Sequence, residues 1–268
     1  MVAGEDKSLS ILFARLDDLY RSADQGLLGS TSFLSPRDLH FALTHLRTTG
    51  RSDRVVLWGG YDAAERQKLY ILPDFMDGAK EYGEFSLYGF ESDISAVEVK
   101  GSGYRKLSHR DFLGSVLGLG LERDVVGDIL VSEGEGDVPR AVIICDTAVS
   151  AFICENLVKV GSDTVKTRVL DTGSIVPPKR KFLHVSDTVA SARLDGVISS
   201  LISVSRERAK EIVLDGAVEV DYEECLRPDK LLTSPCIVTV RGFGKFRINS
   251  LVDKTKKGRT RLDADKYV

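Results

Sequence analysis

The sequence has few cysteines, and none of them is placed as a metal ligand. The four thiols are Cys145, Cys154, Cys225 and Cys236. They contain no C-x-x-C pair, the usual spacing of zinc ligands, and they are too sparse for a disulfide scaffold. We therefore predict free thiols in a reducing, cytosol-like compartment, with no metal and no cofactor.

Membrane and export signals are also missing. No uninterrupted apolar run approaches the ~18 residues that a membrane span requires. Glu5, Asp6 and Lys7 stand where a signal peptide would carry its apolar core. We expect a cytoplasmic protein without a membrane partner.

A general excess of basic residues is absent, but one end of the chain is basic. The net charge is −3 and the pI about 5.9, unlike many nucleic-acid-binding proteins. Between residues 241 and 262, however, eight Lys or Arg stand with one acid, a net +7 that leaves −10 for the remainder. Such an end is the usual footprint of a polyanion partner, and a disordered solubilising tail has the same composition.

The first 80 residues have the patterns of an N-terminal α/β region. Apolar residues at helical spacing from 9 to 20 predict an amphipathic helix. Ser35 followed by Pro36 predicts the start of a second helix, which ends near Gly50. Residues 55–61 and 68–72 read as a hairpin. With 268 residues and 43% hydrophobic content, the chain is long enough for two or three such compact domains of α+β class.

Residues 81–172 follow the order strand, helix, strand, strand, helix, strand. This is the split ferredoxin-like order that many RNA-binding domains share. The aromatic strand motifs that stack bases in RRM domains are absent, and a fold alone does not establish a function. The predicted elements are 94–100, 108–117, 125–131, 140–145, 147–158 and 164–170.

One motif in this region imitates a catalytic site. Residues 109–111 spell the His-Arg-Asp of the protein-kinase catalytic loop, but Val116 stands where that loop needs Asn. Nearby glycines lack the spacing of a dinucleotide-binding loop. We predict instead that Ser108 caps a helix.

Residues 173–186 read as a linker, and residues 187–252 as a small module of two helices and a sheet. Pro177 and Pro178 interrupt regular structure in the linker, and the basic triplet 179–181 follows them. Ser191 is the predicted N-cap of the first helix, and Ser205 that of the second. Strands at 218–222 and 237–241 complete the module, with a basic tail at 253–268.

The module carries the candidate RNA-binding residues. A helix start offers free backbone N–H groups and a partial positive charge, and Arg adds forked donors that match phosphate geometry. A solvated helix face would show the same charges, and the acids between residues 219 and 224 would repel phosphate. The candidates are Arg193, Ser205, Arg206, Arg208, Lys210, Arg241, Lys245 and Arg247.

Two family resemblances give these patterns a context. Arg193-Leu194-Asp195, Ser205-Arg206 and the run 216–220 resemble the S-four domain, an RNA-binding module named after a ribosomal small-subunit protein. The runs 33–37, 59–66 and 108–129 resemble the YlmH-type bacterial RNA-binding proteins, and the photosystem II S-four proteins share this layout. The resemblance implies a non-catalytic protein that binds ribosomal or transfer RNA on the large ribosomal subunit.

Alternative functions remain open at this point. S-four modules also occur in pseudouridine synthases and rRNA methyltransferases, and Asp195 echoes the synthase catalytic triplet, although it is better placed to interact with a helix dipole. A protein–protein scaffold would make the basic residues dispensable. We expect structured RNA and the ribosome as partners, no DNA, no catalytic residue and a monomer.

Overall fold

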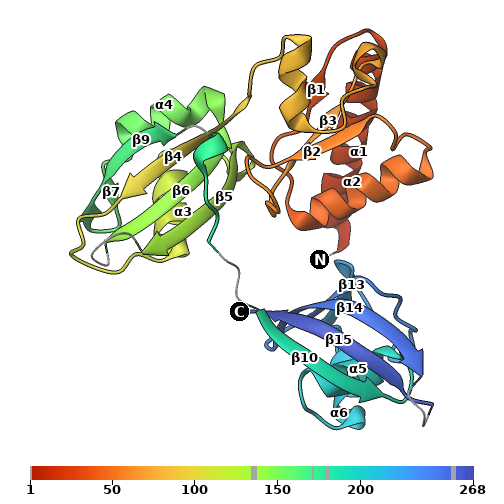
Figure 1. Ribbon diagram of the computed structural model, residues 1–268. Coiled ribbons are helices and arrows are strands. Elements are labelled where there is room, and N and C mark those ends of the chain that lie inside the picture. The colour runs from red at the N-terminus through yellow and green to blue at the C-terminus, as the bar shows by residue number, and fades with distance from the viewer. Residues whose placement is uncertain (1, 134–137, 171, 179–181, 255–257) are drawn as a thin grey trace. The chain divides into compact units, whose positions relative to one another are not determined.

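The computed structural model describes residues 2–133, 138–170, 172–178, 182–254 and 258–268. The chain forms two compact units, Met1–Pro178 and Lys179–Val268, and both combine helices with antiparallel sheets (Figure 1). The α+β prediction is confirmed. Among the described residues, no helix has the length and apolar character needed to cross a membrane.

The N-terminal region packs two helices on a small sheet. Helices α1 (Val2–Asp24) and α2 (Pro36–Thr48) cover the strands β1 (Gly29–Ser30), β3 (Lys68–Ile71) and β2 (Val55–Trp58), which pair in that order. Ser35 caps α2 as predicted, because its hydroxyl accepts from the Asp38 N–H at 3.1 Å. Two 3₁₀ helices, η1 (Asp74–Met76) and η2 (Tyr82–Tyr88), lead to the next domain.

The middle domain has the predicted ferredoxin-like topology. Its elements are β4 (Ile94–Lys100), α3 (His109–Leu117), β5 (Val126–Glu133), β6 (Pro139–Asp146), α4 (Thr147–Asn156) and β9 (Lys166–Leu170). The strands pair in the order β5-β6-β4-β9, and α3 and α4 bury one face of the sheet. Ser108 caps α3, so the kinase-like run is a helix start. A 3₁₀ turn η3 (Arg123–Val125), a hairpin of β7 (Lys159–Val160) and β8 (Asp163–Thr164), and η5 (Thr172–Ser174) complete the unit.

The N-terminal region covers one end of the other sheet face. Phe33, Tyr61 and Ala64 pack against apolar side chains that this face presents near Ile94 and Ile144. The contact buries the two central strands at one end, where an RRM domain would stack bases. The opposite end of the face stays uncovered by this apolar cluster.

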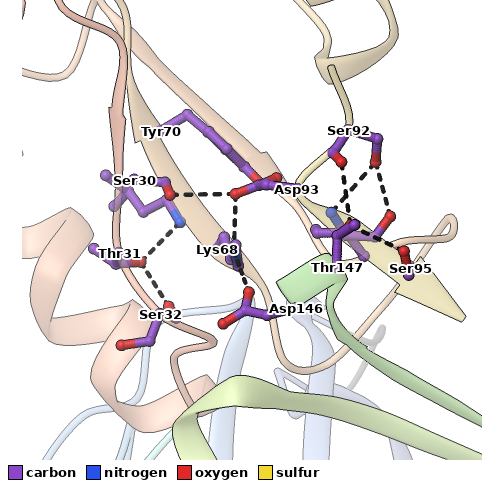
Figure 2. Close-up of polar contacts among 12 residues, drawn as sticks. Ser30, Thr31, Ser32, Lys68, Tyr70, Ser92, Asp93, Ser95, Asp146 and Thr147 are labelled. Carbon is purple, nitrogen blue, oxygen red and sulfur yellow. Dashed lines mark hydrogen bonds and ion pairs between the residues drawn. The ribbon is translucent and has the colours of Figure 1, made fainter. Parts of the chain in front are cut away.

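A buried lysine joins the two parts of this unit. Lys68 on β3 is 5% exposed, and its ammonium group pairs with Asp93 at 2.8 Å and with Asp146 at the start of α4 (Figure 2). Tyr70 and Tyr82 donate to Asp93 at 2.7 and 2.9 Å. Because an unpaired charge is costly to bury, this arrangement fixes β3 against the middle domain.

A second junction uses Asp128 and Arg66. The Asp128 carboxylate accepts from the Tyr61 hydroxyl at 2.7 Å and from the backbone N–H groups of Glu65 and Arg66. The Arg66 guanidinium donates to the carbonyls of Phe33 and Val126 at 2.6 and 3.1 Å. Burial lowers the pKa of Arg66. Hydrogen bonds of Asp128 and Arg66 therefore join the N-terminal region to the middle domain.

The second unit is a six-stranded antiparallel sheet with two helices on one face. The strands are β10 (Phe182–Val189), β11 (Val218–Val220), β12 (Glu223–Glu224), β13 (Cys236–Val240), β14 (Gly244–Lys254) and β15 (Thr260–Tyr267), in the order β10-β15-β14-β13-β11-β12. Helices α5 (Leu194–Leu201) and α6 (Arg206–Leu214) bury their apolar stripes against it.

The structure corrects three predictions for this unit. Arg193, not Ser191, is the N-cap of α5. The strand at 237–241 does not close the module, because β14 continues the sheet. The expected tail at 253–268 contains β15, which pairs along its whole length with β10, and β10 itself lies partly inside the expected linker. The triplet 179–181 lies outside the described residues.

Candidate nucleic-acid interface

The predicted helix-start residues meet at one carboxylate. Asp195, in the first turn of α5, is 3% exposed. Arg193 donates to it at 3.0 Å, and Arg206, the first residue of α6, at 3.1 Å. The Gly196 N–H adds a third donor at 2.7 Å. The sequence did not predict that both arginines share Asp195.

The charge state of this cluster follows from its contacts. Burial would raise the pKa of Asp195, but the hydrogen bonds from Arg193, Arg206 and Gly196 outweigh it and lower that pKa. The hydrogen bond from Arg193 to Asp195 also raises the pKa of Arg193. About half of the Arg206 side chain and somewhat less of Arg193 stay exposed. The cluster therefore carries a net single positive charge with its guanidinium groups outermost.

The other predicted residues of α6 divide between its two flanks. Lys210 is exposed and one turn from Arg206, so the two share a flank. Arg208 points to the other flank and pairs with Glu211 at 2.8 Å. The Ser205 hydroxyl accepts from the Arg208 N–H at 3.2 Å and acts as the helix cap. We name the surface of Arg193, Arg206 and Lys210 the helix-start face.

A polar pocket of about 360 Å³ adjoins Arg206. The loop before β15 brings Arg259 to it, and Arg259 donates to the Thr188 carbonyl at 2.5 Å. The sequence places Arg259 only within the basic end, because it does not predict the pairing of β10 with β15. The Asp187 carboxylate also lines the pocket, as do hydroxyl groups from α5 and its surroundings: Thr188, Ser191, Ser199, Ser200 and Ser203.

Lys245 and Arg247 do not lie with the helix residues. Their neighbours Phe246 and Ile248 enter the core under the helices, so both cations project from the opposite sheet face. Lys245 lies 5.0 Å from the Tyr222 ring centre, and Arg247 pairs with Asp265 at 2.8 Å. Arg241 follows β13 and donates to the Gly216 carbonyl at 3.5 Å.

The acids between residues 219 and 224 lie away from the helix starts. Strand β12 is the sheet edge opposite β10, and α5 packs beside β10. Gly216, which follows α6, sits so close to the hairpin that a Cβ there would lie 2.3 Å from Glu224 Oε1. The acids therefore lie near the C-terminal end of α6, where they do not repel an anion bound at the N-terminus of that helix.

Metal ligands and thiols offer no alternative site in the described part of the chain. No group of three His, Cys, Asp or Glu is arranged there to hold a metal. The four cysteines are free. Burial raises the pKa of the Cys145 and Cys236 thiols to about 12, which keeps them protonated and unreactive.

Comparisons with known proteins find similarities to the middle domain and to most of the chain. Residues 90–173 match the family described as "Putative RNA-binding domain in YlmH". The chain is 29% identical over 233 residues to the "Ribosome-associated protein quality control protein P2" of Bacillus subtilis (strain 168), across 87% of this chain and 84% of that protein. The solved structure "Cell division protein ylmH from Streptococcus pneumoniae" covers 66% of this chain and 98% of its own, with a TM-score of 0.46 and 23% identity. Residues 90–173 are thus similar to the RNA-binding domain described for YlmH, and most of the chain is similar in sequence to the Bacillus subtilis protein.

Proposed function

We propose that the protein is a non-catalytic, cytoplasmic RNA-binding protein that recognises structured ribosomal or transfer RNA on the large ribosomal subunit. The observation that carries the proposal is the helix-start face, where Asp195 fixes two guanidinium groups at helix N-termini. The name of the Bacillus subtilis relative, which calls that protein ribosome-associated, supports the choice of RNA. In this account, residues 187–252 are an S-four type module.

The arrangement favours phosphate contacts over base reading. Arg193 and Arg206 each use part of their donors on Asp195 and keep the exposed edge for an anion. Phosphate contacts position a protein on RNA without reading sequence. The three side chains that define the helix-start face are cationic and none is aromatic, so we expect recognition of RNA shape.

The geometry of Asp195 argues against the synthase alternative. A catalytic carboxylate must reach the substrate, whereas both Asp195 oxygens accept hydrogen bonds from the protein and the side chain is buried. We therefore assign Asp195 the role of positioning two arginines. Mass spectrometry of ribosomal and transfer RNA after incubation with the protein should show no new base modification. A modified base would support the RNA-modifying enzyme instead.

The two flanks of α6 provide a matched test. Lys210→Ala removes a cation from the helix-start face, whereas Arg208→Ala removes one from the other flank of the same helix. Binding of transfer RNA and of ribosomal RNA is measured by fluorescence anisotropy over a range of salt concentrations. We expect Lys210→Ala to flatten the log–log salt slope by about 0.7 to 0.9, one phosphate contact, and to weaken binding roughly fourfold near 0.15 M salt.

The control decides between a specific face and a diffuse charge effect. Arg208→Ala should leave the slope close to that of the wild type. Equal losses in both variants would reject the helix-start face, and so would an unchanged slope in Lys210→Ala.

A further inference from the structure

The uncovered end of the middle-domain sheet carries a row of cations. Backbone pairing places Arg140 on β6 opposite Lys100 on β4, and Lys100 opposite Lys166 on β9. All three project from the face that α3 and α4 leave open, because Val99 and Ala141 next to them enter the helix-side core. Arg168 stands two residues from Lys166 on the same face. We name these four residues the basic row.

A buried carboxylate lies beneath the basic row. Glu98, in the centre of β4, is 1% exposed although it faces the open side of the sheet. Arg140 pairs with it at 2.7 Å, Lys100 approaches to 3.7 Å, and Arg168 donates to it from the next strand. Burial would raise the pKa of Glu98, but Arg168, Arg140 and Lys100 together lower it. The cations therefore cover the carboxylate and form the outer layer.

The basic row is not neutralised by this carboxylate. Among the residues that the structure describes, these four cations stand over one anion, a difference of three positive charges. Like charges directly opposite one another on a sheet reduce stability, and Lys100 has such a neighbour on each side. Lys166 has no ion pair with any residue that the structure describes. An external anion would relieve this repulsion.

The protein's own packing defines what can bind here. At the other end of the face, Phe33 and Tyr61 already cover the central strands. The N-terminal region therefore occupies that end of the central strands, so bases cannot stack there. The side chains of Arg140, Lys100 and Arg168 are 39%, 53% and 64% exposed, and such an array of guanidinium and ammonium groups suits the phosphates of a nucleic-acid backbone.

We propose that the basic row is a second RNA contact, which holds backbone phosphates of a folded RNA on the sheet face of the middle domain. The proposal rests on the RNA-binding function proposed above and adds a binding surface to it. Arg140 and Arg168 are positioned by Glu98, and Lys100 and Lys166 complete the row. The row differs from the helix-start face in fold and in unit, so each contact can be tested separately.

Lysine acetylation measures both contacts in one experiment. The full-length protein is treated with an acetylating reagent with and without purified ribosomal RNA, and modification is quantified by peptide mass spectrometry. We expect RNA to protect Lys100 and Lys166, and Lys210 on the helix-start face. Lys159 on β7 is the matched control, because it is exposed while its neighbour Val160 packs in the helix-side core. It should be modified equally in both conditions.

The outcomes separate the two proposals. If RNA protects Lys210 but neither Lys100 nor Lys166, the basic row is not an RNA contact. An acidic protein would then be the better candidate for its partner. Protection of Lys100 and Lys166 without Lys210 supports the row and contradicts the helix-start face. Protection of none of the three overturns both.

A double variant tests the row by affinity. Lys100→Gln with Lys166→Gln keeps Glu98 paired with Arg140 and Arg168, so the fold is retained, which circular dichroism checks. We expect weaker binding of ribosomal RNA, by roughly tenfold near 0.15 M salt, and a salt slope flatter by about 1.4. Lys159→Gln should bind as the wild type does. Wild-type affinity in the double variant would overturn the proposal.

Discussion

Two charge clusters in residues 1–178 bury charges of opposite sign. At the junction of the N-terminal region with the middle domain, a cation is buried between carboxylates, and the Lys68 side chain is 6% exposed. On the open sheet face, a carboxylate is buried beneath cations, and the Glu98 side chain is 2% exposed. Both clusters satisfy a buried charge with opposite charges, but only the second presents positive charge to the solvent.

The difference separates a structural role from a binding role. Lys68 uses its ammonium group on Asp93 and Asp146 and has little left for a ligand. Glu98 takes part of the hydrogen-bonding capacity of Arg140 and Arg168 and leaves their outer edges exposed. Asp195 in the second unit repeats the latter arrangement with Arg193 and Arg206. A buried carboxylate that positions arginines is thus common to both proposed RNA contacts.

The largest expected effect comes from Lys68. Lys68→Met should lower the free energy of unfolding by about 3 kcal/mol, because it leaves two carboxylates close together without their cation. RNA affinity of the folded fraction should stay at the wild-type value. Urea unfolding with Lys159→Met as the control measures the loss, and a loss below about 1 kcal/mol would show that the junction does not depend on Lys68.

Glu98 should have an intermediate effect that depends on pH. Glu98→Gln should cost about 1 to 2 kcal/mol at neutral pH, since it keeps the shape but removes the charge that pairs with half-exposed arginines. The folded-state pKa of Glu98 is below its ordinary value of 4.5. Its contribution is therefore present above pH 4.5 and is lost as the pH falls through the lowered folded-state pKa.

Urea unfolding of the wild type and Glu98→Gln at a series of pH values checks this expectation. The two stabilities should differ at neutral pH and converge in acid. A difference that stays constant down to acid pH would mean that the carboxylate charge contributes nothing.

The smallest effect is expected from the basic row, and it has the opposite sign. Replacing Lys100 and Lys166 by Gln should raise the free energy of unfolding by up to about 0.5 kcal/mol, because repulsion across adjacent strands is relieved. Added salt should reduce the gain, since salt screens exposed charges. Thermal unfolding at low and high salt measures it, and a salt-independent loss of stability would contradict the assumed repulsion.

Local signals in the sequence were sufficient for most elements. The caps Ser35, Ser108 and Ser205 have short-range hydrogen-bonding partners, so their patterns predicted three helix starts correctly. Alternation and turn residues likewise predicted the ferredoxin-like order. Ser191 failed as a cap because an Arg-Leu bridge holds the chain extended at Arg193 before α5 begins.

Long-range pairing could not be predicted from the same signals. The pairing of β10 with β15 joins residues near 182 to residues near 267, and the polar side chains of β15 made it read as a tail. The basic row was missed for a related reason. Lys100, Arg140 and Lys166 are far apart in the sequence, and only the strand register brings them together. Polar residues recurring at every second strand position were the available signal.

The salt dependence of ribosomal RNA binding by the wild-type protein tests the central claim most directly. The claim is that exposed cations, positioned by buried carboxylates, contact RNA phosphates. With at least three such contacts, a plot of log K against log salt concentration should be linear with a slope of about −2 or steeper. Binding that is independent of salt would contradict the account, and so would failure to bind at low salt.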